Sequence, residues 1–347
     1  MSENRARARG LFLFLRPPFL RPGISLLRLN VSAFLLFLAA AVVAVLSLPA
    51  YGGPAAAGNP GQLAFGSPRK AFDALVNAAN SNDTNEMLAI LGPGGKDIVS
   101  SGDVVADTMA RQRFARSAKQ GVTFRQLNKN TFLALAGKNG WTFPIPIIKK
   151  GGSWMFDTEE GRQEILNRRI GRNELNTIRT SLAYVGAQRE YAKMMARADS
   201  GVLQYAQRFI SHKGSRDGLY WPAGGNSPLG PLFARAAAAG NAPGQGPERR
   251  VPYYGYYFRI LKSQGSHAPG GAIDYVVSGK MTGGFGLVAY PAKYGVSGIM
   301  TFMVNQQSVV YEKDLGPGTA DLAEKITAYD PDRTWAKVEL KEAAFSR

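Results

Sequence analysis

The chain has no cysteine and contains two histidines among its 347 residues. The lack of cysteine excludes disulfides, a thiolate nucleophile and any zinc site built on sulfur. Both histidines, His212 and His267, lie in loop-like Ser-, Gly- and Lys-containing segments, with no acid at a recognisable catalytic spacing. The G-x-S-x-G and Walker A motifs are also absent from the sequence. We therefore predict no catalytic triad, no metal site and no cofactor.

Acidic residues are also scarce, with 25 Asp and Glu against 42 Lys and Arg, a formal net charge of +17. Six arginines and one glutamate among the first 30 residues account for +5, which leaves +12 for the rest of the chain. A surface this basic favours anionic partners such as phospholipid headgroups, acidic polymers and acidic proteins. The chain has no long Lys/Arg block and no nucleic-acid motif, so we do not expect it to bind nucleic acid. A basic surface that serves only solubility is the alternative.

One apolar run, Val31–Leu48, stands near the start, with the six arginines before it and small residues and prolines after it. This order is typical of a secretory signal or signal-anchor over residues 1–50, and it places the rest of the chain outside the cytoplasm. The run is at the lower edge of the roughly 20 residues that cross a bilayer. Cleavage after Ala50 or Ala57 and a retained anchor, with membrane contact through Val31–Leu48, both stay open. We expect a periplasmic protein or one at the outer face of the inner membrane.

Two folded segments follow a Gly/Pro/Ala-rich linker over residues 51–66. In the first, residues 67–157, helical periodicity comes before period-two alternation. The expected helices cover 71–79, 87–91 and 104–119, and the expected strands cover 124–127, 131–136, 143–149 and 153–157. This order indicates an α+β fold in which helices pack on an antiparallel sheet, as in nuclear-transport-factor-like domains. That analogy concerns the fold alone.

The second segment, residues 158–335, is also predicted to be α+β, with a long helix packed on an antiparallel sheet. Apolar residues at helical spacing run from Thr158 to Phe209, with a break near Ser200-Gly201. A loop of more than 30 residues comes next, and loops of that length are usually functional or disordered. Strands are expected over 253–261, 273–277, 285–289, 299–304 and 309–312, followed by a helix over 319–328. Residues 336–347 form a polar tail.

Several segments resemble one bacterial family from about Pro68 to Trp335. They include FPIPIIKKGGSWMFDTEEGRQEIL (143–166), DGLYWP (217–222), YYGYYFRIL (253–261) and MTFMVNQQSVVYEKDLGP (300–317). Together they are similar to the family catalogued as domain of unknown function 2950. The resemblance implies an exported envelope protein of unassigned activity. It implies no catalytic residues.

A second resemblance covers residues 172–312. The helix with Asn173-Glu174, Ala187-Gln188 and Tyr191, and the later turn Gly295-Val-Ser-Gly298, are similar to the globular heads of pilin-like and pseudopilin proteins. Pilins join this helix directly to an apolar N-terminal half that bundles into a fibre. Here a whole domain intervenes, so we do not expect a filament built by such bundling.

The acidic residues offer three groups that could carry chemistry: Asp103 with Asp107; Glu312 with Asp314; and Asp157 with Glu159 and Glu160. The first and third groups lie at expected helix starts, where carboxylates cap the helix and complement its dipole. The second lies on a strand, where partners such as Lys313 or Arg259 are within reach. Two carboxylates could also hydrolyse a wall glycan, which is the alternative function.

Aromatic and basic residues supply the stronger indication. Tyrosines and a tryptophan cluster around the long loop and the strand after it, and arginines line one face of the long helix. The candidate binding surface consists of Tyr220, Trp221, Tyr254, Tyr256, Arg168, Arg169 and Arg172. Such residues are enriched in interfaces, although core packing of the aromatics and a solvated arginine face are the alternatives. On a strand, Tyr254 and Tyr256 would face the same side.

From these features we predict an exported, non-enzymatic binding or structural component that contacts an envelope protein, or an anionic envelope polymer or lipid. The alternative is a carboxylate-dependent hydrolase of cell-wall glycan. The oligomeric state stays open.

Overall fold

The computed structural model describes residues 61–100, 104–198, 201–222, 224–230, 234 and 252–339. The chain separates into the units Met1–Gly53 and Pro54–Arg347, and the described residues belong to the second unit. The predicted signal or anchor at Val31–Leu48 lies outside the described residues, as do most of the linker and the end of the tail. Of the helices that are described, none combines the length and the apolar character that a bilayer crossing demands.

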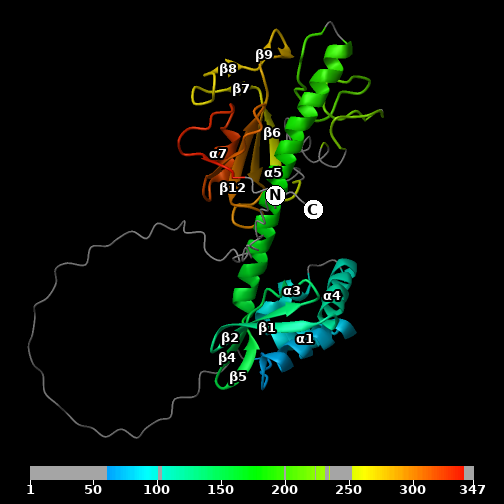
Figure 1. The fold of residues 1–347 in the computed structure, drawn as a ribbon, viewed down its shortest axis with the longest axis vertical. Coiled ribbons are helices and arrows are strands. Elements are labelled where there is room, and N and C mark those ends of the chain that lie inside the picture. The colour runs from blue at the N-terminus through cyan, green and yellow to red at the C-terminus, as the bar shows by residue number, and fades with distance from the viewer. Residues whose placement is uncertain are drawn as a thin grey trace, which may run out of the picture. The chain divides into compact units, whose positions relative to one another are not determined.

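The fold is mixed α+β, and helices precede an antiparallel sheet as predicted (Figure 1). The helical elements are α1 (Pro68–Ser81), α2 (Thr84–Leu91), the 3₁₀ turn η1 (Pro93–Gly95), α3 (Lys96–Val99) and α4 (Val104–Lys119). The strands are β1 (Val122–Asn128), β2 (Thr131–Ala136), β3 (Trp141–Thr142), β4 (Ile147–Lys150) and β5 (Ser153–Phe156). The sheet order is β1-β2-β4-β5, and β3 pairs with β2. Local signals explain the boundaries, because Ser67 caps α1 and the side chain of Asp83 caps α2.

A cluster of phenylalanines forms the centre of this first layer. Phe72 of α1 is fully buried, and its ring meets the rings of Phe114, Phe124 and Phe143 edge-on, with centroids 5.4 to 6.1 Å apart. The apolar stripe read from the sequence of α1 is the face that packs here. Edge-to-face aromatic pairs stabilise a core beyond the area that they bury.

The strand predicted over 143–149 is wrong in its first half. Residues 143–146 are not part of a strand, because Pro144 and Pro146 have no N–H to donate to a ladder, although the Phe143 N–H still donates to the Ala134 carbonyl of β2. Ile145 instead packs against the first turn of the next helix, α5 (Thr158–Ala198, 41 residues). A Cβ on Gly161 would lie 2.6 Å from Ile145, so only glycine allows this approach.

Helix α5 ends at Ala198, earlier than the predicted Phe209. Residues 201–222 contain no helix, and Tyr205 forms a bridge with Met281. This end agrees with the break expected near Ser200-Gly201, but the apolar residues beyond it do not continue the helix.

Figure 1 shows α5 running alongside a second antiparallel sheet. Its order is β14 (Ala336–Lys337), β13 (Tyr311–Asp314), β12 (Met300–Asn305), β11 (Gly286–Pro291) and β6 (Tyr256–Leu261). Two short ladders join β7 (Ser263–Gln264) to β8 (Ile273–Asp274) and β9 (Val276–Val277) to β10 (Lys280–Met281). Helix α7 (Thr319–Glu324) follows β13 in the chain.

The two faces of this sheet pack against different partners. Phe258, Leu287 and Phe302 share a core cluster with residues of α5, whereas Val288 and Met303 share another cluster with Tyr329. The alternation follows from the period of two along a strand. Arg259 donates to the carbonyls of Ala323, Glu324 and Ile326, and so holds the end of α7.

A buried glutamine joins α5 to the segment that follows it. The Nε2 of Gln188 donates to the Tyr184 hydroxyl (2.9 Å) and to the Ala206 carbonyl (2.8 Å), and its Oε1 accepts from the Ala206 N–H (2.8 Å). Gln188 is 0% exposed. Burial also raises the pKa of Tyr184 well above its ordinary value, so its hydroxyl stays protonated and donates to the Gly286 carbonyl. One side chain thus satisfies both backbone groups of Ala206.

We expect Gln188→Leu to lower the free energy of unfolding by about 3 kcal/mol, because the buried N–H and C=O of Ala206 lose their partners. Chemical denaturation of the full chain measures this change. The control is Gln163→Leu on the same helix, where the side chain is exposed and the change should stay below about 0.5 kcal/mol. Equal losses in the two variants would show that the Gln188 hydrogen bonds do not stabilise the fold.

Candidate functional site

The exposed face of α5 carries a row of arginines. Arg162, Arg169 and Arg172 are separated by seven and three residues, which places them on one side of a helix with 3.6 residues per turn. Arg169 and Arg172 are exposed, and neither makes an ion pair or hydrogen bond with any described residue. Two guanidinium groups are therefore available to an outside ligand.

Arg168 was predicted to belong to the same binding surface as Arg169 and Arg172, but it has a different role. Its Nε donates to Glu164 at 2.7 Å, and its other guanidinium nitrogen donates to the carbonyl of Thr142 at 2.7 Å. These bonds hold the start of α5 to the end of β3. Arg168 is thus engaged within the protein, unlike Arg169 and Arg172.

The predicted aromatic residues of the long loop are mostly internal. Trp221 is 4% exposed, and its indole N–H donates to the Gly218 carbonyl at 2.9 Å. The guanidinium of Arg216 lies over the indole ring, 4.6 Å from its centroid. Tyr220 is half-buried, and its backbone N–H pairs with Phe209. These contacts give the aromatics a packing role.

Tyr254 and Tyr256 differ sharply in burial. Strand β6 starts at Tyr256, so the expected alternation from Tyr253 onward is wrong: Tyr254 has a φ of 49° and Gly255 a φ of 74°, which form a turn instead. Tyr254 is 47% exposed, whereas Tyr256 is fully buried and donates to the Met300 carbonyl. Burial raises the pKa of Tyr256 well above its ordinary value, and the negative charges of Glu174 and Glu312 raise it further.

The turn at Tyr254 lies next to α5. The backbone of Gly255 lies against the amide of Asn173, which donates to the Ser297 carbonyl at 2.9 Å. Asn173 follows Arg172 directly and stands one helical turn after Arg169. Tyr254 is therefore one residue away from a contact with the turn of α5 that carries Arg169 and Arg172. We call Arg169, Arg172 and Tyr254 the α5 basic surface.

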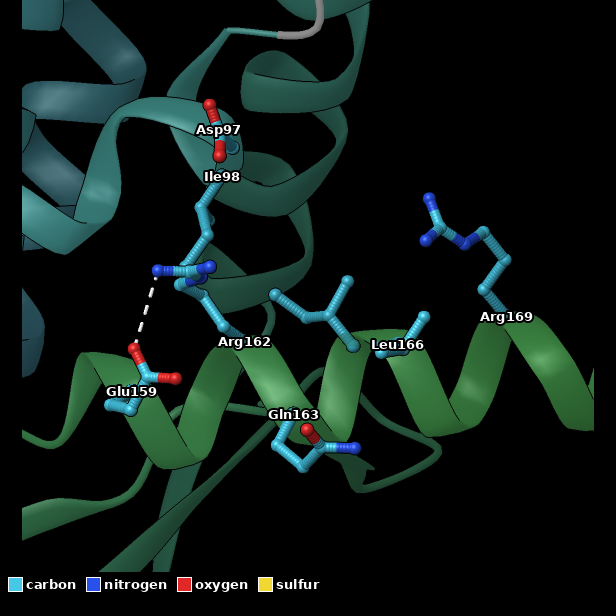
Figure 2. Close-up of a pocket in the computed structure, with 8 residues that line it drawn as sticks. Asp97, Ile98, Glu159, Arg162, Gln163, Leu166 and Arg169 are labelled. Carbon is cyan, nitrogen blue, oxygen red and sulfur yellow. Dashed lines mark hydrogen bonds and ion pairs between the residues drawn. The ribbon is translucent and has the colours of Figure 1, made fainter. Parts of the chain in front are cut away.

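A cavity of about 390 Å³ opens between α3 and the first turns of α5 (Figure 2). Its apolar lining consists of Ile98, Ile165 and Leu166. Its polar lining consists of Asp97, Glu159, Arg162, Gln163 and Arg169. Arg162 pairs with Glu159 at 3.3 Å, as the dashed line in Figure 2 marks, whereas Asp97 makes no ion pair within the described part of the chain. Arg169 belongs both to this cavity and to the α5 basic surface.

Each histidine pairs with an aspartate that the sequence did not reveal. The Nδ1 of His212 lies 2.7 Å from Asp217, and its Nε2 lies 2.5 Å from the guanidinium of Arg208. Because arginine can only donate, Nε2 must accept and Nδ1 must carry the proton. The Ser215 hydroxyl donates to Asp217 and to the backbone carbonyl of His212, not to the imidazole ring, so these residues do not form a Ser-His-Asp triad.

Asp217 holds its own loop together. Partial burial raises the pKa of Asp217, but the hydrogen bonds from Ser215 and His212 and the charge of Arg208 outweigh it and lower the pKa to about 2. The carboxylate therefore stays charged at neutral pH and accepts from the side chain and the backbone N–H of His212. This arrangement serves the local structure.

His267 forms the second pair, with Asp330. Its Nδ1 lies 3.0 Å from the carboxylate, and its backbone N–H donates to the other oxygen at 2.8 Å. The hydrogen bond and charge of Asp330 raise the pKa of His267, and the charge of Asp332 adds to the effect. Across the described ranges, no group of three or more His, Asp or Glu side chains could hold a metal ion.

The chain has relatives in one known protein family. Residues 62–338 match the family described as protein of unknown function DUF2950. The chain belongs to this family. No curated protein and no solved structure matches the chain significantly. The nuclear-transport-factor-like and pilin-like likenesses therefore stay predictions for this DUF2950 protein.

The sequence did not predict the side of the cavity that α3 forms. Helix α3, which carries Asp97 and Ile98, has four residues, too few for a helical period to show. Arg162 could have been found, because it lies seven residues before Arg169 and thus on the same helix face. The spacing alone would not have shown that Arg168 points elsewhere.

We expect Asp330→Asn to lower the pKa of His267 in the DUF2950 protein toward its ordinary value of 6.5. In the wild type, the raised pKa contributes stability that is present below pH 6.5 and is lost as the pH rises through the raised value. NMR titration of the His267 imidazole protons in the wild type and in Asp330→Asn measures the shift. An unchanged His267 titration in Asp330→Asn would contradict this assignment.

Proposed function

We propose that this protein is exported and acts as a non-enzymatic binding component that contacts an anionic partner of the envelope through the α5 basic surface. Among anionic partners, phospholipid headgroups fit the chemistry of this surface best. The observation that carries the proposal is the pair of exposed arginines, Arg169 and Arg172, which no described acid neutralises.

The charge of the whole chain supports the same partner. After the +5 of the first 30 residues, the chain still carries +12, which raises the local concentration of anions around it. Guanidinium groups are weakly hydrated and present a planar fork that matches phosphate oxygens. Arg169 and Arg172 supply two such groups three residues apart on one helix.

Tyr254 adds an amphipathic side chain in the turn that contacts α5 at Asn173. It is 47% exposed, and its ring packs edge-on against Tyr253 with centroids 4.4 Å apart. Tyrosine is enriched where an apolar body and a polar tip meet a headgroup region. A retained Val31–Leu48 anchor would hold the chain at the membrane.

The alternative, a carboxylate-dependent hydrolase, needs two carboxyl groups placed for acid and nucleophile or base roles. Asp97 and Glu159 both line the cavity. However, the Glu159 side chain is 81% exposed and is paired with Arg162. This environment favours binding over catalysis.

The test compares flotation of the full chain with vesicles of phosphatidylglycerol and phosphatidylcholine against vesicles of phosphatidylcholine alone. Basic residues near an anionic surface contribute about 1 kcal/mol each. We therefore expect Arg169→Gln/Arg172→Gln to weaken the phosphatidylglycerol-dependent part of binding by roughly thirtyfold. Wild-type binding should also weaken as salt rises.

The matched control is Arg113→Gln/Arg116→Gln, which removes the same charge from two exposed arginines of α4. It should change vesicle binding much less. Equal losses in the two double variants would show that the net charge alone attracts the vesicle and would remove the role of the α5 basic surface. Binding that ignores phosphatidylglycerol would contradict the proposed partner.

A further inference from the structure

The charges that line the cavity between α3 and α5 are separated along the helix. Asp97 and the Glu159–Arg162 pair lie toward the start of α5, and Arg169 lies toward the other end (Figure 2). Two carboxylates and one guanidinium leave one net negative charge at the first end. Arg169 gives one positive charge at the second end. The cavity is therefore dipolar, although the chain as a whole carries +17.

We propose that this cavity binds a short peptide-like ligand with a free amine at one end and a free carboxylate at the other. The amine meets Asp97 and Glu159, and the carboxylate meets Arg169. The apolar middle of the ligand packs on Ile98, Ile165 and Leu166. This inference goes beyond the proposed function because it assigns a second ligand, of different chemistry, to a neighbouring site.

The dimensions fix the length of the ligand. Glu159 and Arg169 are ten residues apart on α5, which corresponds to about 15 Å along the axis. An extended peptide spans roughly 3.3 Å per residue, so three or four residues, with the reach of the protein side chains, bridge the two ends. The cavity of about 390 Å³ lies within the roughly 300 to 1,000 Å³ of small-molecule sites.

Each end offers a charge that is free to act on a ligand. Asp97 has no ion-pair partner in the described part of the chain, and Arg169 has none either. A guanidinium binds a carboxylate through two parallel hydrogen bonds, which adds direction to the charge attraction. A ligand therefore binds well only when it has both charged termini and places its amine at Asp97 and its carboxylate at Arg169.

The same charges disfavour a lipid in this cavity. A second anion on a phosphorylated lipid would meet Asp97 and Glu159 and be repelled. A zwitterionic headgroup carries its ammonium and phosphate only a few bonds apart, too close to span the two ends. A peptide separates its termini as it lengthens, so it can meet both.

The experiment measures binding of the full chain to Ala-Leu-Ala and Ala-Leu-Leu-Ala by calorimetry, with N-acetylated and C-amidated forms of each peptide. We expect each cap to weaken binding by roughly threefold to tenfold, since each removes one partly exposed charge pair. Arg169→Gln should abolish the effect of the C-terminal amide and keep the effect of the acetyl group. Asp97→Asn should reduce the effect of the acetyl group and keep that of the amide.

The control Arg116→Gln on α4 should leave peptide binding unchanged, and thermal melts confirm that Asp97→Asn is folded. Caps that do not affect affinity, no binding at millimolar peptide, or equal or tighter binding of a short-chain phosphatidic acid would each overturn the inference. Vesicle binding in the absence of peptide reports on the proposed function. Asp97→Asn should weaken peptide binding without weakening vesicle binding, so the failure of one idea can be told from the failure of the other.

Discussion

The attachment of α5 to its surroundings through a few close contacts is the constraint on which the rest of the structure depends. Its first turns require Gly161 against Ile145, because any side chain there would collide. Farther along, the Glu174 carboxylate accepts from the N–H groups of Ile299 and Met300 at 3.0 and 3.1 Å. A methyl group on Gly298 would overlap the Tyr256 hydroxyl, so this turn also depends on glycine. These contacts fix the rotation of the helix about its axis and hence decide which residues it exposes.

That rotation explains why neighbouring arginines behave differently. Arg168 is directed toward Thr142 and is held there, whereas Arg169, one residue later and about 100° around the helix, remains exposed. Arg172 is about 40° around the helix from Arg168 and is also exposed. The same rotation places Ile165 and Leu166 with Ile98 in the lining of the cavity, so this apolar lining and the α5 basic surface result from one helix orientation.

Helical and strand periodicity predicted α1 and α4 well, because their apolar residues repeat at the period of the element that buries them. The candidate site was less accessible to the sequence. The sequence predicts that Tyr254 and Tyr256 face the same side of a strand. Gly255 instead bends the chain between them, so Tyr256 is buried and Tyr254 is exposed. His267 meets Asp330, 63 residues away, through a tertiary contact that no local spacing reveals. Long-range contacts of this kind depend on how loops pack, which a period of 2 or 3.6 does not encode.

In a basic protein with a dipolar cavity, the net charge can attract anionic surfaces while the cavity discriminates between ligands. The net charge acts on anionic surfaces over distances set by ionic screening, about 10 Å at 0.1 M salt, and it does not distinguish one anion from another. The cavity would act only at contact distance. There Arg169 would attract one negative group of a ligand, and Asp97 would repel a second negative group. Because Arg169 belongs to both surfaces, a peptide carboxylate and a headgroup phosphate would compete for the same guanidinium. Occupation of the cavity would then leave Arg172 and Tyr254 as the remaining contacts of the basic surface, and binding at the two sites would be coupled through one side chain.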